Sequence, residues 1–197
     1  MSSSTSIVFK RPNSPLYLQK TYIVYVFVLG DKECGKSSLI RALTTKEVED
    51  SNLPSLTVFQ SRESVSQNVF QLRFCELSEE TIHLEEVKRT CQQQNTVLFF
   101  CFAIDDAYSL HAINRDWIAP LRINIGIELP SILVGNKIDL RGHPSSSGKR
   151  LFKFSCGYKM RKVFDLRLYH ECSSVSGKAI PDLFWLAVGL GLDPDFK

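Results

Sequence analysis

The sequence lacks the features that would place the protein in a membrane or outside the cell. Its longest apolar runs, residues 23–30 and 97–104, are far shorter than the roughly 20 residues that a membrane-spanning helix needs. The six cysteines contain no Cys-x-x-Cys pair, which favours reduced, packed thiols. The sequence shows no signal-peptide core and no lipidation pattern, since residue 2 is Ser2 and residues 195–197 carry no cysteine box. We expect a cytoplasmic protein without a transmembrane segment or lipid anchor, which reaches membranes only through partners.

Neither sign of charge dominates. The chain has 24 Lys and Arg against 21 Asp and Glu, a net charge of +3, so charge gives no indication of a nucleic-acid partner, and we expect none. A hydrophobic fraction of 44% and a charged fraction of 23% are typical of globular domains. The length of 197 residues fits one domain with short extensions. We expect a flexible N-terminal arm at residues 1–20 and one domain at residues 21–197.

From residue 22 onwards, short apolar runs alternate with amphipathic stretches. This pattern predicts an α/β fold with a mostly parallel six-stranded sheet and helices on both faces. The expected strands include residues 22–29, 69–75, 96–103, 131–134 and 166–172, whereas residues 44–68 are polar and predict irregular structure. The expected helices cover residues 37–43, 78–93 and 107–119, the last ended or kinked by Pro120, and Pro181 opens a final helix.

Directly after the first strand, residues 30–37 read GDKECGKS, which fits the phosphate-binding pattern GxxxxGK[ST]. Glycines let the backbone curl so that its N–H groups face phosphates, and the following helix adds a positive N-terminus. Lys36 would reach the β and γ phosphates, and the Ser37 hydroxyl would bind Mg²⁺. The alternative is a glycine-bearing turn with a surface lysine. The phosphate-binding candidates are Lys32, Glu33, Cys34, Gly35, Lys36, Ser37 and Ser38.

A second motif, Gly135-Asn136-Lys137-Ile138-Asp139, follows the buried strand at residues 131–134. The carboxylate of Asp139 can accept two hydrogen bonds from guanine, from N1–H and the 2-amino group, which adenine does not offer. Near the last strand, the stretch with Ser173, Ser174 and Val175 is similar to a loop that closes over guanine through a backbone N–H. Together with Asn136 and Lys137, these residues predict a binding site for GTP or GDP.

With these motifs in this order, residues 21–191 resemble the Ras superfamily of small GTPases. Residues 57–59 (TVF), 104–110 and 171–174 are most similar to the Rho side of the superfamily, and residues 117–121 and 129–137 are similar to Miro proteins. Miro proteins also carry EF-hands and a membrane tail, so mitochondrial anchoring does not transfer to this chain. The resemblance implies a nucleotide-dependent switch that acts on effector proteins.

The chain departs from the family where the resemblance expects Asp-x-x-Gly-Gln after the third strand. When residues 72–74 are aligned with that strand, Cys75, Ser78 and Glu79 take the aspartate, glycine and glutamine positions. A thiol is a poor ligand for Mg²⁺, so we expect Mg²⁺ to be held weakly. Glu79 lacks the amide that orients the attacking water, and Lys32 crowds that water, so we expect hydrolysis to be slow or absent and assign no catalytic residue. The alternative is that Glu79 acts as a general base.

Two metal ligands are expected, Ser37 and the switch I threonine, for which Thr57 is the candidate. Thr57 lies further from Ser37 than is usual in the family. Ser55 is therefore a second candidate for this position, and Thr57 could instead be an ordinary strand residue.

Surface charge predicts partners. An acidic stretch in the switch II region would attract an effector or scaffold protein, and it consists of Glu76, Glu79, Glu80, Glu85 and Glu86. A basic patch at residues 141–167 would fit an acidic partner or an anionic membrane, or is simply a solvated helix face. The favoured interpretation is an atypical small GTPase that binds GTP, hydrolyses it slowly or not at all, and acts by binding partners. Two alternatives remain: a nucleotide-free pseudo-GTPase scaffold, and an active GTPase that uses an unfamiliar catalytic group.

Overall fold

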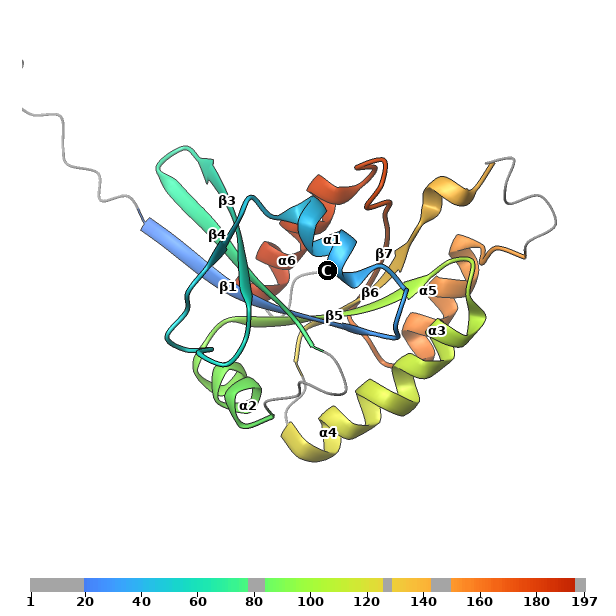
Figure 1. Cartoon of the computed structure of the whole chain (residues 1–197), viewed down its shortest axis with the longest axis horizontal. Coiled ribbons are helices and arrows are strands. Elements are labelled where there is room, and N and C mark those ends of the chain that lie inside the picture. Colours follow the sequence, from blue (N-terminus) through green and yellow to red (C-terminus); the bar gives the residue numbers. More distant parts are fainter. Residues whose placement is uncertain (1–19, 78–83, 126–128, 143–149, 194–197) are drawn as a thin grey trace, which may run out of the picture.

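The computed structural model describes residues 20–77, 84–125, 129–142 and 150–193. These residues form one seven-stranded sheet in the order β2-β3-β4-β1-β5-β6-β7 (Figure 1). The predicted arm at residues 1–20 lies outside the described residues except for Lys20, which is the first residue of β1. The strands are β1 (Lys20–Gly30), β2 (Lys46–Val48), β3 (Val58–Val65), β4 (Asn68–Glu76), β5 (Thr96–Ala103), β6 (Ser131–Asn136) and β7 (Leu168–Glu171).

The predicted α/β class is confirmed, although the sheet has seven strands and not six. Five strands, β4, β1, β5, β6 and β7, run parallel to one another, and the antiparallel strands β2 and β3 extend the sheet beyond β4. The prediction of irregular structure over residues 44–68 was wrong, because β2 and β3 lie there. Exposed polar residues fill much of β3, and sequence pattern alone does not reveal a strand held by backbone hydrogen bonds to its neighbour.

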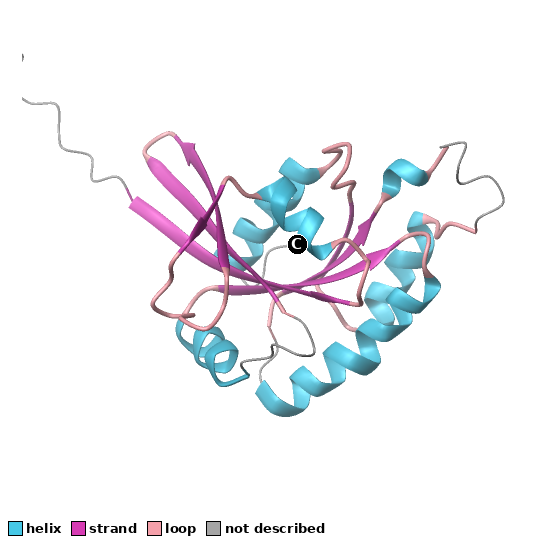
Figure 2. Ribbon diagram, viewed as in Figure 1, coloured by secondary structure: helices cyan, strands magenta, loops and turns pink. Residues whose placement is uncertain are grey.

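Helices cover both faces of the sheet, as predicted (Figure 2). Helices α1 (Lys36–Leu43) and α6 (Ile180–Leu192) share one apolar cluster with the even-numbered residues of β1, such as Val26. The other face packs against the remaining helices, through a cluster that includes Phe27. These helices are α2 (Leu84–Gln93), α3 (Ala107–Ala112), η1 (Ile113–Ile118), α4 (Ala119–Ile125) and α5 (Phe154–Val163). Because side chains of a strand alternate between faces, successive residues of β1 pack against opposite helix layers.

Pro120 does not end its helix, so of the two predicted outcomes, an end or a kink, the end is not observed. The chain stays helical from α3 to the end of α4, and the turn before the proline, η1, is a π-helix. The Ala119 N–H bonds to Asn114 O, five residues back, so the wider turn accommodates a residue that has no N–H to donate. Pro181 does lie in the first turn of α6, as predicted.

No helix among the described residues is long and apolar enough to cross a bilayer.

Candidate functional site

The predicted phosphate loop joins β1 to α1 at the carboxyl end of the parallel strands. Gly35 adopts a left-handed conformation (φ 94°) and precedes α1, which has no side-chain cap. The backbone N–H groups of the first turn therefore point out of the helix end, where the helix dipole favours an anion. A Cβ added to Gly35 would lie 2.4 Å from Asn136 Nδ2, so only glycine fits here. The loop thus leads into an uncapped helix N-terminus, which favours an anion.

Lys36 is the buried cation of this loop. Its Nζ donates to Gly30 O and Asp31 O, both at 2.9 Å, and it lies 3.9 Å from the Glu76 carboxylate. The Lys36 side chain is only 8% exposed, so its amino group is fixed at the mouth of the loop. Ser37 and Ser38 follow Lys36 in the first turn of α1 and are exposed, and Lys32 and Glu33 are exposed in the loop before the helix. The Ser37 hydroxyl is thus available to a metal ion.

Cys34 packs below the loop and is almost fully buried. Burial raises the pKa of the Cys34 thiol, even though Lys36 beside it acts in the opposite direction. The thiol is therefore a neutral packing group, and the part of Cys34 that faces the site is its carbonyl.

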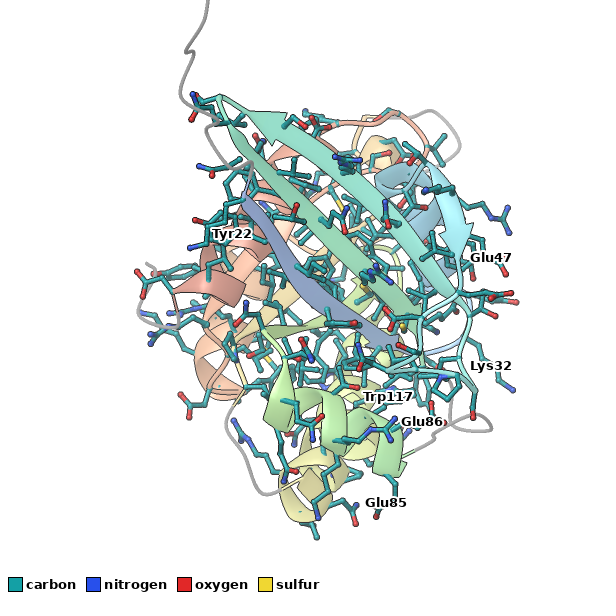
Figure 3. The ribbon with its side chains drawn as sticks, turned by 90° about the vertical axis from the view of Figure 1, so that its left-hand side faces the viewer. Tyr22, Lys32, Glu47, Glu85, Glu86 and Trp117 are labelled. Atoms are coloured by element: carbon teal, nitrogen blue, oxygen red, sulfur yellow. The ribbon has the colours of Figure 1, made fainter. Side chains whose placement is uncertain are left out.

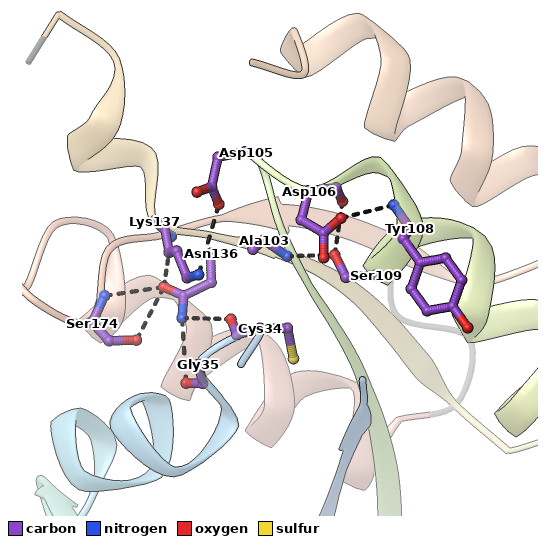
Figure 4. Close-up of polar contacts among 10 residues, drawn as sticks. All are labelled: Cys34, Gly35, Ala103, Asp105, Asp106, Tyr108, Ser109, Asn136, Lys137 and Ser174. Carbon is purple, nitrogen blue, oxygen red and sulfur yellow. Dashed lines mark hydrogen bonds and ion pairs between the residues drawn. The ribbon is translucent and has the colours of Figure 1, made fainter. Parts of the chain in front are cut away.

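The predicted base motif lies against the phosphate loop, and Asn136 joins the two. Its Nδ2 donates to Cys34 O at 3.4 Å and to Gly35 O at 3.3 Å, while its Oδ1 accepts from Ser174 N and Oγ at 3.2 and 3.0 Å (Figure 4). Asn136 ends β6 and is 2% exposed. One buried amide thus brings together three segments that are far apart in the sequence.

Lys137 and Asp139 follow Asn136 at the end of β6. Lys137 takes a left-handed backbone conformation (φ 67°), and its Nζ lies 3.7 Å from Asp105 Oδ1 (Figure 4). Asp139 lies in η2 (Ile138–Leu140), and its carboxylate accepts a hydrogen bond from the Ser173 hydroxyl. Val175 is 84% exposed next to this loop. The two stretches predicted to hold guanine, residues 135–139 and 173–175, therefore lie together at one edge of the sheet.

Asp105 is a site residue that sequence reasoning missed. It follows β5 directly, and polar residues at the carboxyl ends of parallel strands are the usual site residues of open α/β sheets. The neighbouring Asp106 caps α3 by accepting from Tyr108 N at 2.9 Å, which fixes the turn that presents Asp105 (Figure 4). The position of Asp105 just after an apolar strand is the sequence feature that could have identified it.

The structure corrects the assignment of the third-strand aspartate position. Cys75 faces the apolar cluster beneath α2, on the opposite side of the sheet from the phosphate loop, and burial raises the pKa of its thiol to about 12. Glu76 is the residue that faces Lys36, and it pairs with Val28 in the strand register. A shift of one residue along a strand moves a side chain to the other face, so the sequence alignment was one residue out of register.

Of the remaining candidates, Thr57 is exposed and comes immediately before β3, and the Ser55 N–H donates to Glu86 Oε2 at 3.4 Å. Glu79 and Glu80 lie outside the described residues. Glu85 and Glu86 project from α2 (Figure 3), whereas Glu76 belongs to the phosphate loop surroundings and not to an outer acidic face. In the basic patch, Arg141 pairs with Glu171 and Arg161 donates to Leu166 O. The other exposed cations of the described part of the patch are Arg150, Lys153, Lys159, Lys162 and Arg167.

Comparison with known proteins identifies the family of the chain. The model of the Ras family matches residues 25–189, which is most of the chain. The chain belongs to the Ras family. Curated relatives include the Rho-related protein racI of Dictyostelium discoideum, 24% identical over 85% of both chains. The GTP-binding protein rho2 of Schizosaccharomyces pombe is 28% identical over 84% of this chain and 85% of its own. The GTP-binding protein RHO1 of Saccharomyces cerevisiae is 27% identical over 84% and 81%.

These relatives place this Ras-family chain on the Rho side, as the sequence predicted. Family membership supports GTP binding at the level of the family. The likeness to Miro proteins stays a prediction.

Proposed function

We propose that this Ras-family protein binds GTP or GDP together with Mg²⁺ and acts as a slowly hydrolysing, partner-binding switch. The observation that carries the proposal is the position of Asn136, whose one side chain bonds to the phosphate loop and to the Ser174 segment. The phosphate loop and the segment proposed to bind the base are thereby held at a fixed distance, as binding of one nucleotide to both requires. The residues that would hold the base are Asn136, Lys137, Asp139, Ser173, Ser174 and Val175.

The metal ion would be held by hard oxygen ligands. Exposed Ser37 lies in the first turn of α1, and the Glu76 carboxylate faces the same loop, 3.9 Å from Lys36 Nζ. Mg²⁺ prefers such oxygens and neutralises phosphate charge when bound. Thr57 is the proposed switch I ligand. Weak Mg²⁺ binding was predicted because Cys75 is a thiol, and that reason no longer applies, since a carboxylate takes the position.

Slow hydrolysis does not depend on which alignment is used. If the Asp-x-x-Gly-Gln pattern starts at Cys75, Ser78 and Glu79 take the glycine and glutamine positions, and if it starts at Glu76, Glu79 and Glu80 take them. In both cases the glutamine position holds a glutamate and the glycine position holds a bulkier residue. A carboxylate has no amide N–H to donate and repels phosphate oxygens. We therefore propose that the protein signals through nucleotide binding more than through turnover.

Partners are proposed to include an effector or scaffold protein that recognises the acidic switch II region, of which Glu85 and Glu86 on α2 are described. The basic patch on α5 is proposed as a second, weaker surface for an acidic partner or anionic lipid. A cytoplasmic location remains part of the proposal.

The test is the nucleotide content of the purified protein. The protein is denatured, the released nucleotide is separated by ion-exchange chromatography, and its amount is compared with the amount of protein. Stoichiometric GTP supports slow hydrolysis, and GDP supports binding but shows that hydrolysis occurs. No nucleotide, and no binding of added GTP, overturns the proposal in favour of a scaffold.

Two variants link the nucleotide to the site. Lys36→Ala and Ser37→Asn should each lower nucleotide retention at least tenfold, because they remove the loop cation and the metal-binding hydroxyl. Ser155→Asn makes the same chemical change at an exposed serine in α5 and should retain nucleotide like the wild type. Retention that is unchanged in both site variants would refute the assignment.

A further inference from the structure

A polar network ties the segment between β2 and β3 to the sheet. Asp50 Oδ2 accepts from the Tyr25 hydroxyl at 2.9 Å and from Arg73 Nη1 at 2.6 Å, and its side chain is 3% exposed. Tyr25 on β1 and Arg73 on β4 are partners in the register of the two strands, so both donors are presented side by side. Moving the Asp50 carboxylate away would be costly, because Arg73 and Tyr25 would lose their hydrogen-bond acceptor.

The residues that follow Asp50 close this network into a turn. Asn52 Nδ2 donates to the Tyr25 hydroxyl oxygen at 2.8 Å, and Asn52 N donates to Asp50 Oδ1 at 2.9 Å. Leu53 N donates to Asp50 O at 3.0 Å, and the Leu53 side chain is fully buried in the apolar cluster beneath α2. Residues 50–53, here called the latch, are therefore fixed by charge, hydrogen bonds and apolar burial at once.

Helix α2 adds two exposed ties to the same segment. Arg89 Nη2 donates to Asn52 O at 2.9 Å, and Glu86 Oε2 accepts from Ser55 N at 3.4 Å. Exposed polar contacts of this kind contribute little alone. The Arg89 contact therefore only supplements the latch, and the Ser55 contact, which lies outside residues 50–53, is weak enough to break when Ser55 moves.

We propose that the latch stays in place in every nucleotide state, so that the nucleotide response of this switch segment is confined to residues 54–57. The segment ends at Val58, which begins β3 and pairs with Cys75, so Thr57 moves between two fixed points. A partner that contacts residues 50–53 would not sense the nucleotide, whereas a partner that contacts residues 54–57 would. This inference rests on the proposed nucleotide binding, because it describes regulation of that same site.

The experiment is hydrogen–deuterium exchange at residue resolution on nucleotide-free protein and on protein loaded with GDP or a non-hydrolysable GTP analogue. The Asn52 and Leu53 amides should be equally protected in all three states, while the amides of residues 55–57 change. Tyr25→Phe removes only the hydroxyl that joins Asp50 to Asn52, and it should raise exchange of both latch amides about tenfold in each state.

Tyr22→Phe is the matched control. Tyr22 lies on the same strand but stacks on Phe70 across the other face, so loss of its hydroxyl should leave exchange in the latch unchanged. Asp50→Asn is a second variant, which removes the charge that pairs with Arg73 and should raise latch exchange at least as much as Tyr25→Phe; latch exchange that stays unchanged would overturn the inference.

Exchange at residues 50–53 that follows the nucleotide as strongly as residues 55–57 would overturn the inference, as would latch exchange that is unaffected by Tyr25→Phe. If no nucleotide binds, the proposed function fails by itself. Loss of latch protection in nucleotide-free Tyr25→Phe then still shows whether the latch exists.

Discussion

The contact between Asn136 and the phosphate loop predicts a measurable coupling between two substitutions. Gly35→Ala forces an L residue into a left-handed conformation (φ 94°), which costs about 1–2 kcal/mol. Its Cβ would also lie 2.4 Å from Asn136 Nδ2, so the amide must move and its bonds to the loop carbonyls must break. With about 1 kcal/mol for these contacts, we expect Gly35→Ala to destabilise the protein by about 2–3 kcal/mol.

Asn136→Ala removes the clashing group together with its hydrogen bonds and should by itself cost about 3 kcal/mol. In the double variant, Gly35→Ala has no amide to displace, so only its backbone strain remains. The losses in free energy of unfolding of the two single variants should therefore add up to about 1 kcal/mol more than the loss measured for the double variant. Gly142→Ala isolates backbone strain, because Gly142 has φ +85° and no heavy atom within 4 Å of an added Cβ.

The assay is urea unfolding of nucleotide-free protein for the four members of the cycle and for Gly142→Ala, with slopes compared to check that unfolding remains two-state. Gly142→Ala should lower the free energy of unfolding less than Gly35→Ala does, and the difference measures the cost of displacing the Asn136 amide. If the cycle is additive within about 0.3–0.5 kcal/mol, Asn136 does not hold the phosphate loop, and the structural basis of the proposed function is lost.

Three further outcomes follow from burial. In the native protein at pH 8, a thiol reagent should label Cys156 first, since it is the only described cysteine that is not buried, and labelling of any other cysteine at the same rate would contradict this. Stability should fall as pH rises above about 9, by up to about 1.4 kcal/mol per pH unit for each thiol that ionises only on unfolding; flat stability to pH 11 in urea titrations would refute it. The thiols whose pKa burial raises to about 12 are Cys75, Cys91 and Cys172. Gly191→Ala should lower stability by about 1–3 kcal/mol in thermal unfolding, because its Cβ would lie 2.4 Å from Val24 Cγ1, and an unchanged midpoint would show that α6 can move away from β1.

The α/β class and the family could be predicted from the sequence because their signals are local. Strand β5 is a continuous apolar run, and the glycines and lysine of the phosphate loop are contiguous with the helix they precede. Both features depend on residues that are adjacent in the sequence, so they can be recognised without knowing which segments pack against them.

The failures share one physical origin, which is that partners across the sheet are invisible in the sequence. Strand β3 was missed because its backbone bonds to β4 stabilise it and its side chains do not reveal it. Pro120 was expected to end or kink a helix, and the chain remains helical through a wider π-helical turn, with Trp117 and Leu121 on either side of the proline packed in the core.

The sequence by itself determined the phosphate loop, the guanine motif and their order along the chain, since each depends on a short run of residues. Only the tertiary structure decided that Glu76 and not Cys75 faces Lys36, because strand register assigns a side chain to one face or the other. Only the tertiary structure, likewise, could bring Asn136 against Gly35 and Asp50 against Tyr25 and Arg73. These contacts join residues that are far apart in the sequence and become neighbours only when the chain folds.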